Sequence, residues 1–200
     1  MSNQKQLLVE YIPLSYNQYE LNEAVKGGGP FRVKAVLQRA NSKNQNGRIY
    51  PKPILIRESE KYLVEFVNQR RALGELDHPE SRTVVNLANV AHNITEMHWD
   101  GDDLVGTLEI LNTPSGNIVK QLMLAGIRLG LSSRGVGSVE SLGEGAVQVA
   151  EDYNLICFDI VSNPSTDGAF IAEGVKNALT DNRTLRINEL VGDFFAELGK

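Results

Sequence analysis

The sequence has 200 residues, of which 42% are hydrophobic and 22% charged, and its formal net charge is −5. This length and composition are typical of one globular domain with a sizeable core, and the mild acidity without any Lys/Arg run argues against a nucleic-acid surface. One cysteine excludes a disulfide framework and favours a reducing intracellular compartment, and no apolar run is long enough to span a bilayer. The three histidines and the cysteine lack zinc-site spacing, so we expect neither a metal nor a cofactor.

The first part of the chain predicts two strands and one helix. Leu7 to Ile12 alternates weakly, as an edge strand does, and residues 31–37 alternate as in a half-buried strand. Residues 41–47 are polar and predict a surface loop. An apolar stripe at three-to-four spacing then predicts a helix from near Pro53 to near Ala72.

The second part predicts two hairpins separated by a helix. Residues 90–99 and 104–111 flank an Asp-Gly-Asp-Asp turn, and Thr113 begins a helix that ends at Gly126. Residues 146–161 predict the second hairpin. The total is about six strands with two or three helices between them. We therefore expect an α+β protein with an antiparallel, barrel-like sheet wrapped by helices.

A stretch rich in glycine and hydroxyl groups, Gly130 to Ser138, follows the second predicted helix. Glycine beside serine lets a second backbone approach the hydroxyl, as an attacking serine requires, although a polar turn has the same composition. Ser132 and Ser133 are both candidates for the nucleophile. Only one of them can face the site, because adjacent strand residues point to opposite faces. The strained elbow of α/β-hydrolases is disfavoured, because no glycine follows the serine as that turn requires.

An acid stands inside a strand that is apolar on both faces, residues 155–161. Burial of an ionised Asp159 there is costly, so it needs a histidine, an arginine or a set of backbone donors as its partner. His78 lies in a rigid Asp-His-Pro tripeptide outside any core periodicity. A serine, a histidine and a buried aspartate are the parts of a nucleophile–base–orienter system. The alternatives are a structural arginine pair for Asp159 and an ordinary loop position for His78.

The remaining candidate side chains are weaker. His92 and His98 share one parity in the predicted strand 90–99 and indicate a polar strand face. Cys157 is a poor nucleophile, because apolar surroundings raise the pKa of a thiol. Asp167 is the rival of Asp159 for the orienting role.

Four motifs together resemble the prohead core proteases of tailed phages, which are capsid maturation serine proteases distantly similar to herpesvirus assemblin. The motifs are Gly-Arg-Ile-Tyr-Pro (47–51), Leu-Gly-Glu-Leu-Asp-His-Pro (73–79), Gly-Leu-Ser-Ser-Arg-Gly-Val-Gly-Ser (130–138) and Phe-Asp-Ile-Val-Ser-Asn-Pro-Ser (158–165). They stand in the family's order, and the resemblance runs from about Phe31 to Ala172. The second and third motifs together are specific, whereas either alone is moderate evidence. The resemblance also implies a barrel of antiparallel strands surrounded by helices.

The resemblance implies a role for each candidate residue. His78 corresponds to the general base, Ser132 to the nucleophile and Asp159 to the third member of the triad. Assemblins have a second histidine in the third position, so the chain is similar to the phage branch. The oxyanion donors stay open between the Ser133–Arg134 backbone and the loop after Asp159. Arg134 either positions that loop or meets an acidic substrate residue.

The resemblance further implies cleavage of scaffold and major capsid proteins after Glu in Leu/Ile-x-Glu contexts, inside the prohead in the host cytoplasm. Ile187-Asn188-Glu189 fits this preference, which predicts self-cleavage after Glu189. We expect no nucleic-acid or membrane partner, and self-association of unknown stoichiometry. The expected domains are an N-terminal arm (1–30), a protease domain (31–175) and a tail open to processing (176–200). The alternative function is a non-catalytic capsid assembly or scaffold protein of the same fold.

Overall fold

The structure is a computed structural model, and it describes residues 5–16, 26–77, 82–143 and 146–162. All of these residues belong to the first of two units into which the chain divides, residues 1–166 and 167–200. Of the candidate site residues named above, His78, Asp167 and Glu189 lie outside the described residues. The expected division into residues 1–30, 31–175 and 176–200 therefore stays a prediction.

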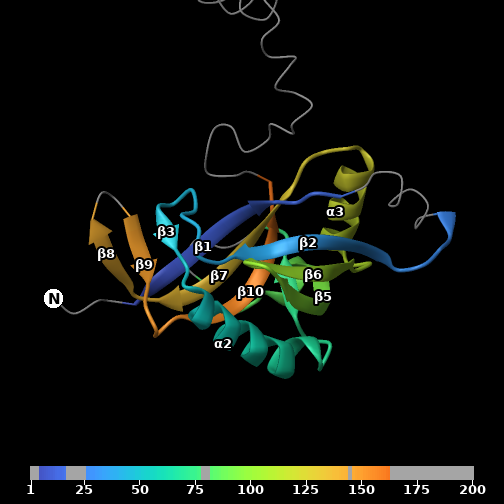
Figure 1. The fold of residues 1–200 in the computed structure, drawn as a ribbon. Coiled ribbons are helices and arrows are strands. Elements are labelled where there is room, and N and C mark those ends of the chain that lie inside the picture. Colours follow the sequence, from blue (N-terminus) through green and yellow to red (C-terminus); the bar gives the residue numbers. More distant parts are fainter. Residues whose placement is uncertain (1–4, 17–25, 78–81, 144–145, 163–200) are drawn as a thin grey trace, which may run out of the picture. The chain divides into compact units, whose positions relative to one another are not determined.

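The described residues are mostly strands with few helices (Figure 1). The strands are β1 (Gln6–Pro13), β2 (Phe31–Arg39), β3 (Arg48–Ile49), β4 (Leu73–Glu75), β5 (Val90–Asp100), β6 (Asp103–Ile110), β7 (Gly130–Gly137), β8 (Val139–Gly143), β9 (Ala146–Val149) and β10 (Asn154–Val161). The helices are α2 (Lys52–Tyr62), a π-helical turn (Leu63–Val67), a 3₁₀ turn (Leu87–Asn89) and α3 (Pro114–Leu124). The α+β class is confirmed.

The described strands form three sheets. One has the order β1-β7-β10 and another the order β2-β6-β5-β4, both antiparallel. In the smallest, β9 lies between β8 and β3, antiparallel to β8 and parallel to β3. Within the described part of the chain no sheet closes on itself, so the barrel expectation is not confirmed.

Several local predictions are confirmed by the backbone. β2 alternates between buried and exposed side chains along most of its length, and β5 and β6 form the predicted hairpin around Gly101, whose φ is +56°. Thr113 caps α3, because its Oγ1 accepts a hydrogen bond from the Gly116 N–H at 3.0 Å. The helix ends beyond Leu124 at Gly126, whose φ is +75°.

Two predicted elements are wrong in their extent or pairing. The first helix ends at Tyr62 and continues as the π-helical turn over Leu63–Val67, so it stops short of Ala72. The second hairpin does not form, because β9 pairs with β8 and β3 while β10 pairs with β7. β10 is apolar on both faces, and its position beside β7 inside the protein covers both of them. This burial favours pairing with β7 over pairing with β9, although β9 is closer in the sequence.

The core consists of two clusters of buried apolar side chains. The larger is built from β2, β5, β6, α3, β7 and β10, and it includes Phe158 and Tyr62 with ring centroids 5.7 Å apart. The smaller lies between β1, α2 and β9, around Tyr50 and Tyr153. β7 and β10 are thus held between core and covering segments, which makes the middle of this sheet a rigid platform for side chains.

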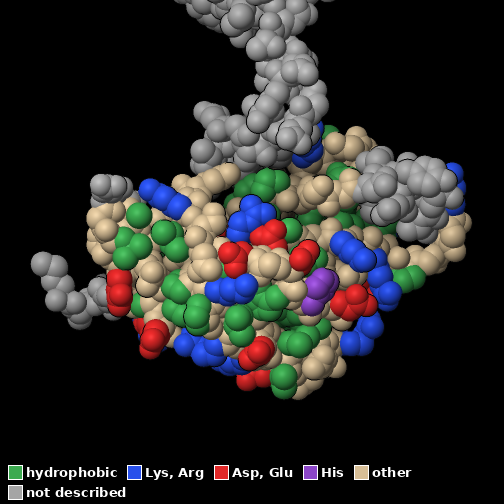
Figure 2. Space-filling model, in the orientation of Figure 1, with side chains coloured by type: hydrophobic (Ala, Val, Ile, Leu, Met, Phe, Trp, Pro, Cys, Tyr) green, Lys and Arg blue, Asp and Glu red, His purple; other side chains and the backbone are tan. Residues whose placement is uncertain are grey.

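The outer surface carries mixed charge. On the face seen in Figure 2, acidic and basic side chains are interspersed with apolar ones. Some of them form exposed ion pairs, such as Arg32 with Glu109 at 2.9 Å, and pairs of this kind contribute little to stability. Among the described residues no helix has the length and apolar character needed to cross a membrane.

Candidate active site

The two competing serines lie in the middle of β7, the central strand of its sheet. Ser132 stands opposite Asp159 of β10, and Ser133 stands opposite Phe158. In an antiparallel pair, residues directly opposite each other project from the same face of the sheet. Ser132 and Asp159 therefore share one face, and Ser133 shares the other face with the core residue Phe158.

Ser133 faces a buried polar cluster on the core side of the sheet. On β1 it stands opposite Glu10, which accepts a hydrogen bond from Gln38 Nε2 at 3.1 Å. The ring of Tyr153 packs on this face against Gly135, two residues after Ser133. Among the described residues the hydroxyls of Ser132 and Ser133 both lack a well-formed hydrogen bond, and the Ser133 side chain lies near that of Tyr153. Its surroundings are those of a structural residue, on the face opposite to Asp159.

Asp159 is fully buried, and its carboxylate has two of the partners expected from the sequence, an arginine and a backbone N–H group. Its Oδ2 lies 2.9 Å from Arg134 Nε, and its Oδ1 accepts from Arg134 Nη2 at 3.2 Å. The backbone N–H of Glu75 also donates to Oδ1, at 3.0 Å. Burial raises the pKa of Asp159 above its ordinary value, and the Glu75 N–H and the Arg134 charge act in the opposite direction. The prediction of a buried acid in need of partners is confirmed.

Arg134 is itself fully buried, on the same face as Ser132 and Asp159. Its Nη2 donates to Glu75 Oε1 at 2.9 Å, and its Nη1 donates to the carbonyl oxygen of Arg82 at 3.0 Å. A guanidinium occupied in this way inside the protein favours the positioning role over contact with an acidic substrate residue. Cys157 Sγ lies 3.2 Å from Arg134 Nε, and burial raises the pKa of the thiol, as expected for a poor nucleophile.

The chain on both sides of His78 lies beside this cluster. Leu76 forms a parallel bridge with Ile160, and the Asp77 N–H donates to the Ile160 carbonyl oxygen at 2.8 Å. Asp77 has a φ of +58°, a left-handed conformation that redirects the chain. On the far side of His78 the described chain resumes at Arg82, the residue that Arg134 contacts. Two of the three candidate residues, Ser132 and Asp159, thus lie opposite each other. The third, His78, is outside the described residues, and the described chain before it ends at Asp77, which contacts Ile160.

The structure corrects the interpretation of the other histidines. His98 is exposed, but His92 is fully buried between Gly74 and the Phe158 carbonyl group. Burial lowers the pKa of His92 to about 4, so it is neutral at pH 7. The prediction that His92 lies on a polar strand face is wrong, because the first half of β5 is buried on both faces. A register shift between Ile94 and Glu96 separates this buried half from the second half, which contains His98.

Sequence reasoning missed Glu75 as a member of this site. It lies in the motif that ends with His78, but the motif gave no reason to bury it, and its side chain is 0% exposed. An acid between Gly74 and Leu76 in a short apolar run was the available signal. It has the same form as the argument that found Asp159.

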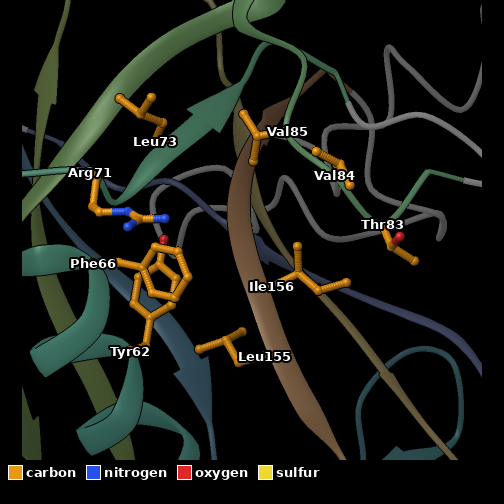
Figure 3. Close-up of a pocket in the computed structure, with 9 residues that line it drawn as sticks. All are labelled: Tyr62, Phe66, Arg71, Leu73, Thr83, Val84, Val85, Leu155 and Ile156. Atoms are coloured by element: carbon orange, nitrogen blue, oxygen red, sulfur yellow. The ribbon is translucent and has the colours of Figure 1, made fainter.

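A groove of about 430 Å³ lies at the start of β10 (Figure 3), and Ser132, Arg134 and Asp159 are not among its described lining residues. Tyr62 and Phe66 form one wall, and Leu155 and Ile156 of β10 form another. Arg71 is the only charged side chain among its described lining residues, and its guanidinium lies 5.0 Å from the centre of the Phe66 ring. The groove therefore offers apolar walls and one positive charge. Within the described ranges, no three His, Cys, Asp or Glu side chains group as a metal site would need.

Comparison with known proteins assigns the family. Residues 13–181 match the model of the prohead core protein serine proteases. The chain belongs to this family. It is 31% identical, over 173 residues, to the prohead core protein protease of Enterobacteria phage T4, covering 84% of this chain and 79% of that protein. The resemblance inferred from the four motifs is confirmed.

The fold agrees with a solved structure of the same family. The bacteriophage T4 capsid assembly protease gp21 superposes with a TM-score of 0.71 at 29% identity, over 81% of this chain and 100% of that one. The β1-β7-β10 sheet and its companions are therefore a prohead protease fold.

Proposed function

We propose that this chain is a serine endopeptidase of prohead maturation, with Ser132 as nucleophile, His78 as general base and Asp159 as the orienting acid. The observation that carries the proposal is the direct pairing of Ser132 with Asp159 on one face of β7 and β10. The hydrogen bond from Asp77 to Ile160 supports the place of His78, because it anchors the residue before His78 beside Asp159 on β10.

The proposed mechanism uses these groups in turn. His78 removes the proton from Ser132 Oγ, which attacks a peptide carbonyl carbon and later releases the acyl group to water. Asp159 holds the imidazole tautomer and stabilises the imidazolium. Among the described residues Arg134 Nε is the one ionic contact of Asp159 Oδ2, which leaves that oxygen a lone pair for His78. The oxyanion donors are backbone N–H groups, either of the Ser133–Arg134 segment or of the loop after Asp159.

The proposed substrates are scaffold and major capsid proteins inside the prohead in the host cytoplasm, cut after Glu in Leu/Ile-x-Glu sequences. The name of the T4 relative, a capsid assembly protease, supports this substrate class. The groove supports the sequence preference, because its apolar walls suit a Leu or Ile side chain and Arg71 suits a carboxylate. We further propose that the enzyme self-associates and needs no cofactor.

A serine-reactive fluorophosphonate probe tests the nucleophile. The wild-type chain and Ser133→Ala are expected to label, whereas Ser132→Ala and His78→Ala are not, and their turnover of a Leu-x-Glu peptide falls on the order of 10⁶-fold. Ser133→Ala is the matched control, because it removes the adjacent hydroxyl from the opposite face. Labelling of Ser132→Ala with loss in Ser133→Ala would reverse the assignment. A wild-type chain that neither labels nor cleaves would instead support a non-catalytic assembly protein.

A further inference from the structure

One buried guanidinium contacts three described segments near the proposed triad. Arg134 lies on β7, two residues after Ser132, and its Nε lies 2.9 Å from Asp159 Oδ2 on β10. Its Nη2 donates to Glu75 on β4, and its Nη1 to the backbone of Arg82. Glu75 precedes His78 and Arg82 follows it. The two described residues that flank positions 76–81, Glu75 and Arg82, are therefore both attached to the strand that carries the proposed nucleophile.

The charges make this attachment rigid. The side chains of Glu75, Asp159 and Arg134 are all 0% exposed, so two carboxylates share one guanidinium away from water. The second cation is Arg82, whose Nη2 lies 3.5 Å from Glu75 Oε2 and whose side chain is 46% exposed. Removing any buried member leaves an uncompensated charge, which is far more costly than losing a surface ion pair.

Glu75 is fixed by its backbone as well as by its side chain. Its N–H donates to Asp159 Oδ1, and its Oε1 accepts from the Asn86 N–H at 3.0 Å in addition to Arg134. The planar fork of arginine can meet two carboxylates and a carbonyl oxygen at once, whereas a lysine ammonium cannot reproduce that geometry. Before His78, Glu75 is thus held by Asp159 and Arg134, and after it Arg82 is held by Arg134 again.

We propose that Arg134 and Glu75 are positioning residues, whose contacts fix the described chain on both sides of His78, at Glu75 and at Arg82, to the strand of Ser132. This inference rests on the proposed function, and it assigns neither residue a contact with the substrate. A base displaced by even about 1 Å costs a large factor in rate, while peptide binding in the groove stays intact. Loss of either residue should consequently lower kcat and leave KM unchanged.

Arg134→Lys and Glu75→Gln test the proposal in the full chain. Lysine keeps the positive charge without the fork, and glutamine keeps an oxygen that can accept from Arg134 and Asn86 without the negative charge. We expect each to lower kcat on a Leu-x-Glu peptide, and the rate of fluorophosphonate labelling, by tenfold or more with KM within twofold. Glu109→Gln is the control. It removes a carboxylate on β6 that pairs with Arg32 and Arg70, and the kcat of this variant should stay within twofold of the wild-type value.

Circular dichroism and thermal melting establish which variants are folded. If Arg134→Lys fails to fold, Glu75→Gln decides the question. A folded Glu75→Gln with kcat within twofold of the wild type overturns the proposal, as does a Glu109→Gln variant that loses as much kcat as Glu75→Gln. A change confined to KM also overturns it. An inactive, unlabelled wild-type chain would contradict the proposed function instead, so the two failures are distinguishable.

Discussion

Ser132 and Ser133 are neighbours in the sequence, yet they lie in opposite environments. Ser132 shares a face with a carboxylate and a guanidinium, and Ser133 faces the core side with Glu10 and Tyr153. The alternation of strand side chains separates the two hydroxyls completely. For this reason the chemistry at this position depends on register, and register is set by the pairing of β7 with β10.

At the same scale, Asp159→Asn is expected to lower kcat/KM roughly 10⁴-fold, because an amide cannot hold the correct tautomer of the base. The variant should stay folded with a lower melting temperature, since Arg134 keeps Glu75 as a partner. Peptide cleavage rates and thermal melting check both parts. Asp167→Asn is the comparison, and an inactive Asp167→Asn beside a fully active Asp159→Asn would move the orienting role to Asp167.

Glu10 gives a second prediction for a single residue. Burial raises its pKa from 4.5 to about 7, and Gln38 donates to one of its oxygens. Between these two values the folded chain retains a proton that the unfolded chain has released. The free energy of unfolding should therefore fall by about 3 kcal/mol as pH rises from 4.5 through 7, with the contribution intact below pH 4.5.

Urea unfolding of the wild type and Glu10→Gln across pH 4 to 8 measures this contribution. Glutamine has no proton to lose, so the difference between the two curves should change as pH rises from 4.5 to about 7 and level off above that pH. Parallel curves would mean that Glu10 keeps an ordinary pKa in the folded chain.

At the scale of elements, β4 and β10 approach unusually closely around Gly74. A Cβ at this position would overlap the Phe158 carbonyl oxygen and the ring of His92. Neither neighbour can withdraw, because one is strand backbone and the other is a fully buried side chain. The glycine therefore permits the packing that delivers Glu75 to Asp159.

Gly74→Ala is accordingly expected to lower the free energy of unfolding by about 3 kcal/mol and to reduce peptide cleavage with it. Gly29→Ala is the matched control, because a Cβ there meets nothing within 4 Å, and it should change stability by less than about 0.5 kcal/mol. Chemical denaturation of both variants checks the prediction. Equal stability of the two would contradict the close packing at Gly74.

Considering the whole molecule, the sequence predicts local structure better than it predicts pairing. The alternation in β2, the turn at Gly101 and the cap at Thr113 depend on near neighbours, and all three are present. The pairing of β10 with β7 depends instead on tertiary packing, because a strand that is apolar on both faces must be covered on both sides. Local pattern carries no such information, and the second predicted hairpin is wrong for that reason.

The candidate site divides in the same way. Asp159 could be found because a buried acid must have partners, and its need for an arginine and a backbone donor follows from desolvation. Glu75 satisfies the same argument, but its strand has only three residues, too few for periodicity to indicate burial. The convergence of both acids on Arg134 arises from three strands that meet in space, which no spacing along the chain encodes.

A prediction for the whole chain concerns its tail. We expect the active enzyme to cut itself after Glu189 and release residues 190–200, because Ile187-Asn188-Glu189 fits the proposed preference and lies well beyond Val161, where the described strands end. A cleavable segment must be able to enter the site extended. Intact-mass spectrometry of the wild type and Ser132→Ala, incubated alike, tests this. An intact wild-type tail, or equal loss from Ser132→Ala, excludes self-processing there.

The central position of β7 also has a consequence for folding during translation, because its sheet is complete only when both neighbouring strands have been made. Its neighbours are β1, which ends at Pro13, far before β7 in the sequence, and β10, which begins at Asn154, shortly after β7 ends at Gly137. Closing the long loop between β1 and β7 is entropically costly, and non-local strand pairing of this kind is slow. A nascent chain that has not yet exposed β10 lacks Asp159 and the partner that fixes the register of Ser132. If Ser132 and Asp159 form the proposed catalytic pair, the site is therefore complete only after β10 has been translated.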